Sequence, residues 1–206
     1  MLSADFLHLE KDVEMVNEYA DIFHLDIMDG VFVPNLSYGF PVVEAIASKA
    51  EKPLDVHLMI VEPEKYVERF AKAGADMISF HLNATKDPAA VLQQIHSLGV
   101  KAGLVINPDI PVEELFPYIP LCDYILLMSV FAGFGGQKFI EDTYQRIRTL
   151  KEEIDRNGLD IQIEVDGGVS PTNAKALIEA GAEILVAGSA VFKAENPAEV
   201  VAAMRG

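Results

Sequence analysis

Two side chains on one apolar segment, those of His24 and Asp26, have the residue types and the spacing to do chemistry. Residues 23–30 are predicted to form a short buried strand followed by a polar, glycine-closed loop. Because side chains alternate along a strand, His24 and Asp26 point to the same face. Burying an imidazole beside a carboxylate costs free energy unless something compensates them. A divalent metal is one such compensation, and a plain His–Asp hydrogen bond is the other.

Two more polar residues, His57 and Asp166, lie at the ends of other predicted strands. With His24 and Asp26 they supply two imidazoles and two carboxylates, a set that suits Zn²⁺, Fe²⁺, Mn²⁺ or Co²⁺ and leaves positions for substrate oxygens. Four such groups at equivalent strand ends favour a metal site over isolated buried histidines. Asp55 and Glu164 precede two of these residues by two positions, so they share the inward face but lie deeper, as supporting or structural groups.

Three methionines also occur at strand ends, Met28, Met59 and Met128. A single methionine in such a place usually fills a gap in the core. Met28 and Met59, however, each lie two residues beyond a potential ligand and therefore point the same way. We expect them to form a thioether wall above the metal that excludes water.

Glycine-rich segments follow the last predicted strands, at residues 129–137, 167–168 and 187–190. Glycine lets backbone N–H groups approach an anion closely, and the loops after the seventh and eighth strands of a (β/α)₈ barrel commonly bind phosphate. A glycine-rich turn alone is a weak signal. Its position beside the histidine and aspartate set makes a phosphate site the better interpretation.

The elements that position these residues alternate along the chain. We predict seven strands, a two-residue strand stub at Leu2-Ser3, and helices between them. The strands are predicted at 23–28, 54–60, 77–81, 101–106, 124–130, 161–166 and 184–187, and the helices at 9–19, 42–50, from Pro63, at 88–98, from Pro111, at 139–157, 171–180 and 197–204.

This order of elements calls for a parallel sheet covered by helices. The strands are continuously apolar, as expected when both faces are buried. Polar residues end many of the strands, whereas an open doubly wound sheet concentrates its ligands at one switch point. We therefore predict an α/β fold, a (β/α)₈ TIM barrel formed by residues 1–206 as one domain.

Composition limits the partners. The chain has 206 residues, is 50% hydrophobic and carries a formal net charge of −16. The negative charge disfavours nucleic acid and anionic membranes as partners but not a small anionic substrate held by backbone amides. No apolar run approaches the ~20 residues of a membrane span. One cysteine, Cys122, fits a reducing compartment, so we expect a cytoplasmic protein, with a homo-oligomer left open.

Six segments in order along nearly the whole chain resemble the ribulose-phosphate 3-epimerase family. They are HLDIMDG (24–30), VPN (33–35), LDVHLM (54–59), GFGGQ (133–137), EVDGG (164–168) and VAGSA (186–190). The family is a (β/α)₈ barrel of the pentose phosphate pathway. Its members interconvert D-ribulose 5-phosphate and D-xylulose 5-phosphate with a divalent metal.

The resemblance implies a role for each matching residue. It implies that His24, Asp26, His57 and Asp166 bind the metal, and that Asp26 and Asp166 are the acid–base pair. It implies a methionine shelf over the intermediate, consistent with Met28, Met59 and Met128. The implied substrate contacts, chiefly to the phosphate, are His57, Gly133, Phe134, Gly135, Gly136, Gly167, Gly168, Gly188 and Ser189.

The chemistry agrees with these residues. Inversion at C3 removes a proton α to the C2 carbonyl and returns one to the opposite face, which two carboxylates on opposite sides achieve most simply. A metal would polarise the carbonyl and stabilise the enediolate. In an eight-stranded barrel, Asp26 and Asp166 lie three strand steps apart, nearly across its mouth.

The sequence also departs from the family pattern. The family has a full first strand with a substrate-contacting serine before Leu2, whereas this chain begins inside that strand, so we expect a truncated first strand. Phe131-Ala132 stands where the family has Asn-Pro, and Asn83 stands where it has an acidic residue. Two alternatives stay open: a D-allulose-6-phosphate 3-epimerase, and a sugar-phosphate-binding barrel with impaired catalysis.

Overall fold

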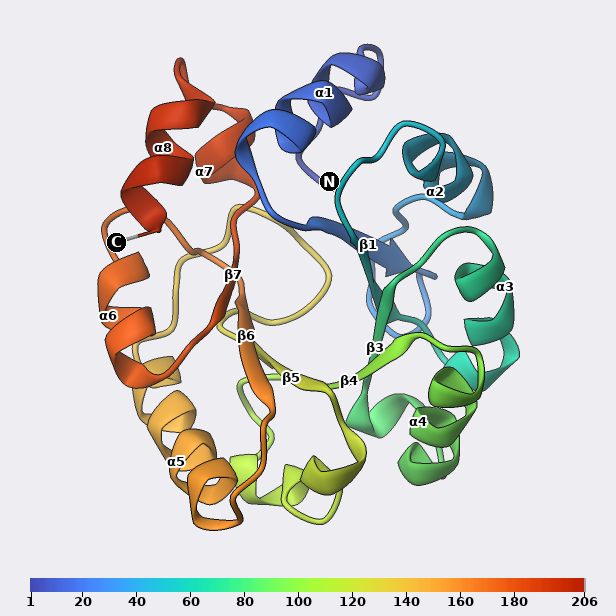
Figure 1. Cartoon of the computed structure of the whole chain (residues 1–206), viewed down its shortest axis with the longest axis vertical. Helices are drawn as coiled ribbons and strands as arrows, with labels where there is room; N and C mark the ends of the chain where they lie inside the picture. Colours follow the sequence, from blue (N-terminus) through green and yellow to red (C-terminus); the bar gives the residue numbers. More distant parts are fainter. Residues whose placement is uncertain (206) are drawn as a thin grey trace.

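Seven parallel strands form one sheet in sequence order in the computed structural model, which describes residues 1–205. The strands curl around a central axis and the helices lie outside them (Figure 1). The strands are β1 (Phe23–Met28), β2 (Leu54–Met59), β3 (Met77–His81), β4 (Lys101–Ile106), β5 (Tyr124–Met128), β6 (Gln162–Asp166) and β7 (Ile184–Val186).

Eight α-helices cover the sheet within the described residues. They are α1 (Leu9–Tyr19), α2 (Phe40–Ala47), α3 (Val67–Lys72), α4 (Pro88–Ser97), α5 (Thr143–Arg156), α6 (Ala174–Ala180), α7 (Ser189–Phe192) and α8 (Pro197–Met204). Short 3₁₀ helices occur at Pro63–Lys65, Leu82–Ala84, Val112–Leu115 and Ile119–Leu121. None of the helices found in residues 1–205 combines the length and the apolar character needed to cross a membrane.

The alternation of side chains divides each strand between two apolar layers. On β1, Leu25 and Ile27 belong to the large core between the sheet and the helices, as predicted. The alternate residues His24, Asp26 and Met28 face the sheet interior. There Met28 packs with Met59 in a separate cluster. Because both faces are buried, apolar residues dominate the strands, and the buried polar residues of β1 and β2 lie on the interior face.

The predicted strands and helices are present, with shifts at their ends. The helix predicted from residue 139 begins at Thr143, because the Ile140 amide donates to the Ser129 carbonyl oxygen and not to a helical acceptor. The helix predicted from Pro171 begins at Ala174, after a turn in which the Asn173 side chain accepts from the Ser170 amide. The segment after Pro111 is a 3₁₀ helix.

The strand stub predicted at Leu2-Ser3 is not formed, so that prediction was wrong. These two residues lie in a turn in which the Ala4 amide donates to the Met1 carbonyl oxygen. Two residues offer too few ladder hydrogen bonds to compete with such a turn. Within residues 1–205, β1 and β7 are the two ends of the sheet and are not hydrogen-bonded to each other. The described structure is therefore a curled seven-stranded sheet with a gap between β7 and β1.

Candidate functional site

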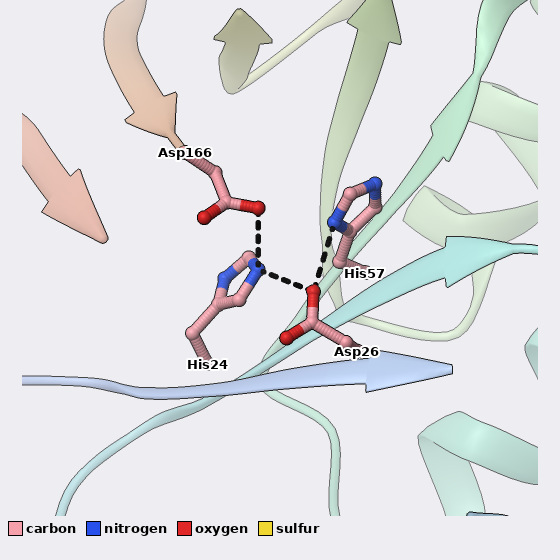
Figure 2. A group of neighbouring side chains, drawn as sticks. All are labelled: His24, Asp26, His57 and Asp166. Carbon is pink, nitrogen blue, oxygen red and sulfur yellow. Dashed lines mark ion pairs between the residues drawn. The ribbon is translucent and has the colours of Figure 1, made fainter. Parts of the chain in front are cut away.

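The four side chains predicted to bind metal converge on one point inside the sheet (Figure 2). His24 and Asp26 come from β1, His57 from β2 and Asp166 from β6. The Asp26 carboxylate lies between the two imidazoles, with Oδ1 3.4 Å from His24 Nε2 and 3.5 Å from His57 Nδ1. Asp166 Oδ2 lies 4.0 Å from His24 Nε2. One potential ligand atom from each residue lies within 4.8 Å of all the others.

The hydrogen-bond partners of the two histidines test whether this set fits a metal. His24 Nε2 and His57 Nδ1, the ring nitrogens that face Asp26, are buried and have no hydrogen-bond partner in the described structure. The other nitrogen of each ring is paired: His24 Nδ1 lies 2.5 Å from Asp55 Oδ2, and His57 Nε2 lies 3.0 Å from His81 Nε2. Ligating histidines commonly show this arrangement, one nitrogen toward the metal and one toward a supporting acceptor. The residues therefore fit a divalent cation.

A fully buried polar layer lies directly beneath these residues. The Tyr124 hydroxyl donates to Asp55 Oδ1 over 2.7 Å, and Glu164 Oε1 lies 3.4 Å from His24 Nδ1. Asp55 and Glu164 therefore occupy the deeper inward positions that their spacing predicts. Tyr124 has room because Gly103 on the neighbouring strand β4 has no side chain, and a Cβ there would overlap the tyrosine ring.

The same surroundings push the pKa values of the two predicted acid–base residues in opposite directions. Burial raises the pKa of an aspartate, but His24 and His57 outweigh it for Asp26 and hold its pKa well below the usual value. For Asp166, burial and the nearby charge of Asp26 both raise the pKa. Burial alone would lower the pKa of His24, yet Asp55 and Asp26 hold it well above the usual value. Asp26 thus stays ionised more readily than Asp166.

A cavity of about 400 Å³ opens over this cluster and continues along the gap between β7 and β1. Met28, Met59 and Met128 are buried and contribute to its wall. All the glycines predicted to contact substrate also line it, together with Phe134 and Ser189. His57 is fully buried and is not among the lining residues, so its predicted contact with substrate stays a prediction.

Backbone amides at one end of the cavity are available to an anion. Among the described residues, the N–H groups of Gly135, Gly136, Gly168 and Gly188 donate to no protein acceptor. Gly168 has φ +64°, and a Cβ there would lie 2.8 Å from the Phe139 nitrogen, so only glycine fits without displacing the chain. Amides turned toward a shared cavity are a common way to bind phosphate.

Three side chains hold the loop formed by residues 131–137 in place. The Asn35 side chain donates to the Gly133 carbonyl oxygen, and Asn107 Oδ1 accepts from the Ala132 amide. Gln137 Nε2 donates to the carbonyl oxygens of Phe131 and Phe134 within the loop itself. The loop is therefore anchored to the segments that follow β1 and β4.

Sequence reasoning missed three residues of this region: His81, Tyr124 and Ser3. His81 and Tyr124 are strand residues at inward positions, but their partners, His57 and Asp55, lie on other strands. Ser3 lines the cavity, where its Oγ would lie 3.1 Å from a Cβ on Gly188. The alternation of side chains along β3 and β5 could have placed His81 and Tyr124 on the inward face of the sheet. No such pattern in the sequence places Ser3 in the cavity.

A sequence model described as the "Ribulose-phosphate 3 epimerase family" matches residues 1–192. The chain belongs to that family. A ribulose-phosphate 3-epimerase of Synechocystis is 53% identical over 100% of this chain and 90% of its own length. The ribulose-phosphate 3-epimerase of Bacillus subtilis is 46% identical over 100% of this chain and 96% of its own length.

Solved structures support the fold of this family member. A crystal structure of KGPDC from Streptococcus mutans superimposes with a TM-score of 0.76 over 99% of this chain and 93% of its own. The two sequences are only 17% identical, so the likeness shows the architecture alone. The chain is thus an enzyme of the ribulose-phosphate 3-epimerase family with a curled parallel α/β fold.

Proposed function

We propose that this protein inverts the configuration at C3 of D-ribulose 5-phosphate to give D-xylulose 5-phosphate, with one divalent metal ion at the His24, Asp26, His57 and Asp166 cluster. Support comes from one arrangement above all. Two carboxylates with oppositely shifted pKa values meet two imidazoles beside a cavity that ends in unpaired glycine amides. The relatives named above are ribulose-phosphate 3-epimerases, which fits a pentose phosphate as the substrate.

The two histidines would hold the metal through His24 Nε2 and His57 Nδ1, and Asp26 and Asp166 would complete the ligand set. A divalent cation in this position supplies positive charge that polarises the C2 carbonyl and offsets the charge of the enediolate. The ion can be Zn²⁺, Fe²⁺, Mn²⁺ or Co²⁺, since all four accept mixed imidazole and carboxylate ligands.

Asp26 and Asp166 carry the proton transfer in this proposal. For one direction of reaction, the ionised Asp26 removes the C3 proton from one face of the substrate, and Asp166 delivers a proton to the opposite face. Each carboxylate reverses its role in the other direction. An acid–base pair needs one protonated and one ionised member at the start of each turnover. The different surroundings of the two carboxylates support this division of labour, since Asp26 lies between both imidazoles and Asp166 lies near His24 alone.

The remaining predicted site residues bind and shield the substrate. The glycine amides would donate hydrogen bonds to the phosphate oxygens. Met28, Met59 and Met128 would cover the planar intermediate and limit access of water, which would otherwise exchange or misplace the proton. A soft thioether surface suits this task because it is apolar and adapts its shape.

We also propose the finer points of fold and location. The curled seven-stranded sheet corresponds to seven strands of a (β/α)₈ barrel, with the remaining strand position between β7 and β1. β1 and β7 are not hydrogen-bonded to each other, and the Met1 amino group donates to the His24 carbonyl oxygen on the free side of β1, which supports the assignment. A reducing compartment such as the cytoplasm suits the single, buried thiol of Cys122.

The test follows turnover and the C3 proton together. Purified protein loaded with each metal in turn is incubated with D-ribulose 5-phosphate in deuterated water. We expect D-xylulose 5-phosphate to form and deuterium to enter at C3. Binding of the sugar phosphate with neither product nor exchange would overturn the proposal and favour a binding-only barrel. A strong preference for D-allulose 6-phosphate, measured in parallel, would overturn the choice of substrate.

A further inference from the structure

His57 and His81 form a buried imidazole pair beside the proposed metal site. His81 is the last residue of β3, and both side chains are completely buried. Their ring centroids lie 5.1 Å apart and their planes are inclined by 24°, so the rings meet edge to edge at the two Nε2 atoms. The Phe32 ring packs against His81, with centroids 4.8 Å apart. Apart from His57, no described protein group hydrogen-bonds to the His81 ring, since Nδ1 has no partner.

The contact between the two rings restricts where their protons lie. His57 Nε2 and His81 Nε2 are 3.0 Å apart, a hydrogen-bond distance. Two neutral imidazoles form this bond only when one Nε2 carries the proton and the other offers its lone pair. If His81 donated, His57 would carry its proton on Nδ1, the nitrogen that faces Asp26, and could not bind a metal through it. If His57 donates, Nδ1 of His57 has a free lone pair.

We propose that His81 is a positioning residue, which acts as the hydrogen-bond acceptor that holds His57 in the Nε2–H tautomer and frees His57 Nδ1 for the metal. This inference rests on the proposed metal site. The two imidazoles keep two protons in total: His57 carries one on Nε2, and His81 carries the other on Nδ1. Without metal, the opposite arrangement lets His57 Nδ1–H face Asp26, so metal binding and the tautomers of the pair are coupled.

The two histidine ligands are thus supported in different ways. His24 is held by the carboxylate of Asp55, which is itself fixed by the Tyr124 hydroxyl. His57 is held by a neutral ring that adds no negative charge to the buried layer. Packing against Phe32 and the contact with His57 Nε2 hold the plane of His81 and so direct its Nε2 lone pair toward His57.

The test compares two substitutions of His81 and needs no activity assay. His81→Gln keeps a hydrogen-bond acceptor at a similar reach, whereas His81→Phe keeps an aromatic ring without one. Zn²⁺ affinity is measured by competition with a chelating dye. We expect the Phe variant to bind Zn²⁺ about 10- to 100-fold more weakly than wild type, as is typical for loss of such a supporting group. The Gln variant should recover most of that loss. His96→Gln, at an exposed position, is the matched control.

Histidine ¹⁵N–¹H correlation spectra of the wild type give a second, variant-free measurement. In the Zn²⁺-loaded protein we expect the proton of His57 on Nε2 and that of His81 on Nδ1. Wild-type Zn²⁺ affinity in a folded His81→Phe variant, or a proton on His81 Nε2 in the loaded protein, would overturn this role of His81. Absence of Zn²⁺ binding by the wild type would overturn the metal site itself, and this role with it.

Discussion

Asp26 and Asp166 have identical side chains, and their neighbours make them chemically different. Asp26 lies between two imidazoles, so its ionised form is favoured and its pKa falls. Asp166 is farther from them and faces the Asp26 charge, so its pKa rises. An inversion by two bases requires one carboxyl group that loses its proton readily and a second one that keeps it.

Asp166→Asn tests the acid–base role at this scale. The amide has nearly the same shape but can neither hold nor deliver the proton, so we expect turnover of D-ribulose 5-phosphate to fall by at least ~10²-fold. The thermal unfolding midpoint should stay close to that of wild type. Asp160→Asn, an exposed aspartate just before the same strand, is the control and should keep wild-type turnover. Near-normal turnover of Asp166→Asn would contradict the role.

The raised pKa of Glu164 predicts that the free energy of unfolding depends on pH. Burial and the charge of Asp55 raise its pKa from 4.5 to about 8. Between these two values the folded protein keeps a proton that the unfolded chain releases, so this residue makes the folded state less stable as pH rises. Glu164→Gln lacks the titration. Relative to wild type, the variant's free energy of unfolding should therefore improve from pH 5 to pH 8 by more than about 1 kcal/mol.

Chemical denaturation in the presence of EDTA measures this difference, because a bound metal would add its own pH dependence. Glu152→Gln, at an exposed position on α5, is the control and should show the same pH trend as wild type. If the free energies of unfolding of Glu164→Gln and wild type differed by the same amount at every pH, Glu164 would be ionised in the folded protein and the prediction would be wrong.

At the scale of single elements, strand geometry sets the spacing of the site. On β2 the inward residues are Asp55, His57 and Met59, which lie in the polar layer, the ligand cluster and the methionine wall in turn. Alternate residues of a strand are about 6.6 Å apart, which is the spacing that such layers need. Val56 and Leu58 face the helices and anchor the strand in the apolar core.

The loop after β6 gives a prediction about substrate binding. In Gly168→Ala, the new Cβ would lie 2.8 Å from the Phe139 nitrogen, so the loop must shift and its amide must move. We expect the KM for the sugar phosphate to rise about tenfold or more, from a displaced phosphate contact. The control is Gly158→Ala, since Gly158 has φ +63° against +64° for Gly168 but open space around it. An unchanged KM in Gly168→Ala would argue against phosphate binding at this loop.

For the whole molecule, the gap between β7 and β1 predicts that strands beside the gap open locally at a lower free-energy cost than strands in the middle of the sheet. β7 has three residues, is only partly buried and pairs with β6 alone. β4 is paired on both sides, with β3 and β5. We expect backbone amides of β7 to exchange with deuterium at least about tenfold faster than those of β4, because edge strands open locally at lower cost. Equal protection in a mass-spectrometric exchange experiment would contradict an open edge in solution.

Metal removal should separate function from folding. The large core between the sheet and the helices is apolar and lies apart from the proposed ligands, so its packing does not depend on a metal. EDTA treatment is expected to abolish epimerisation and to leave the far-ultraviolet circular dichroism unchanged. Zn²⁺ or Co²⁺ should then restore turnover. Unfolding on chelation would instead assign the metal a structural role.

Local patterns in the sequence determined much of this protein. The seven strands follow from their apolar runs, and the shared face of His24 and Asp26 follows from strand periodicity. The four residues predicted as ligands do meet, because each lies near the end of a parallel strand of the same sheet, and such ends lie together.

Only the tertiary structure decided how the site is supported and where the sheet ends. The pairings of His57 with His81 and of Asp55 with Tyr124 join residues on different strands, and nothing in a single strand specifies such partners. The absent strand at Leu2-Ser3 likewise depends on competition between a turn and a short ladder. The opposite pKa shifts of Asp26 and Asp166 have the same origin, since distance and burial in three dimensions, and not residue type, determine them.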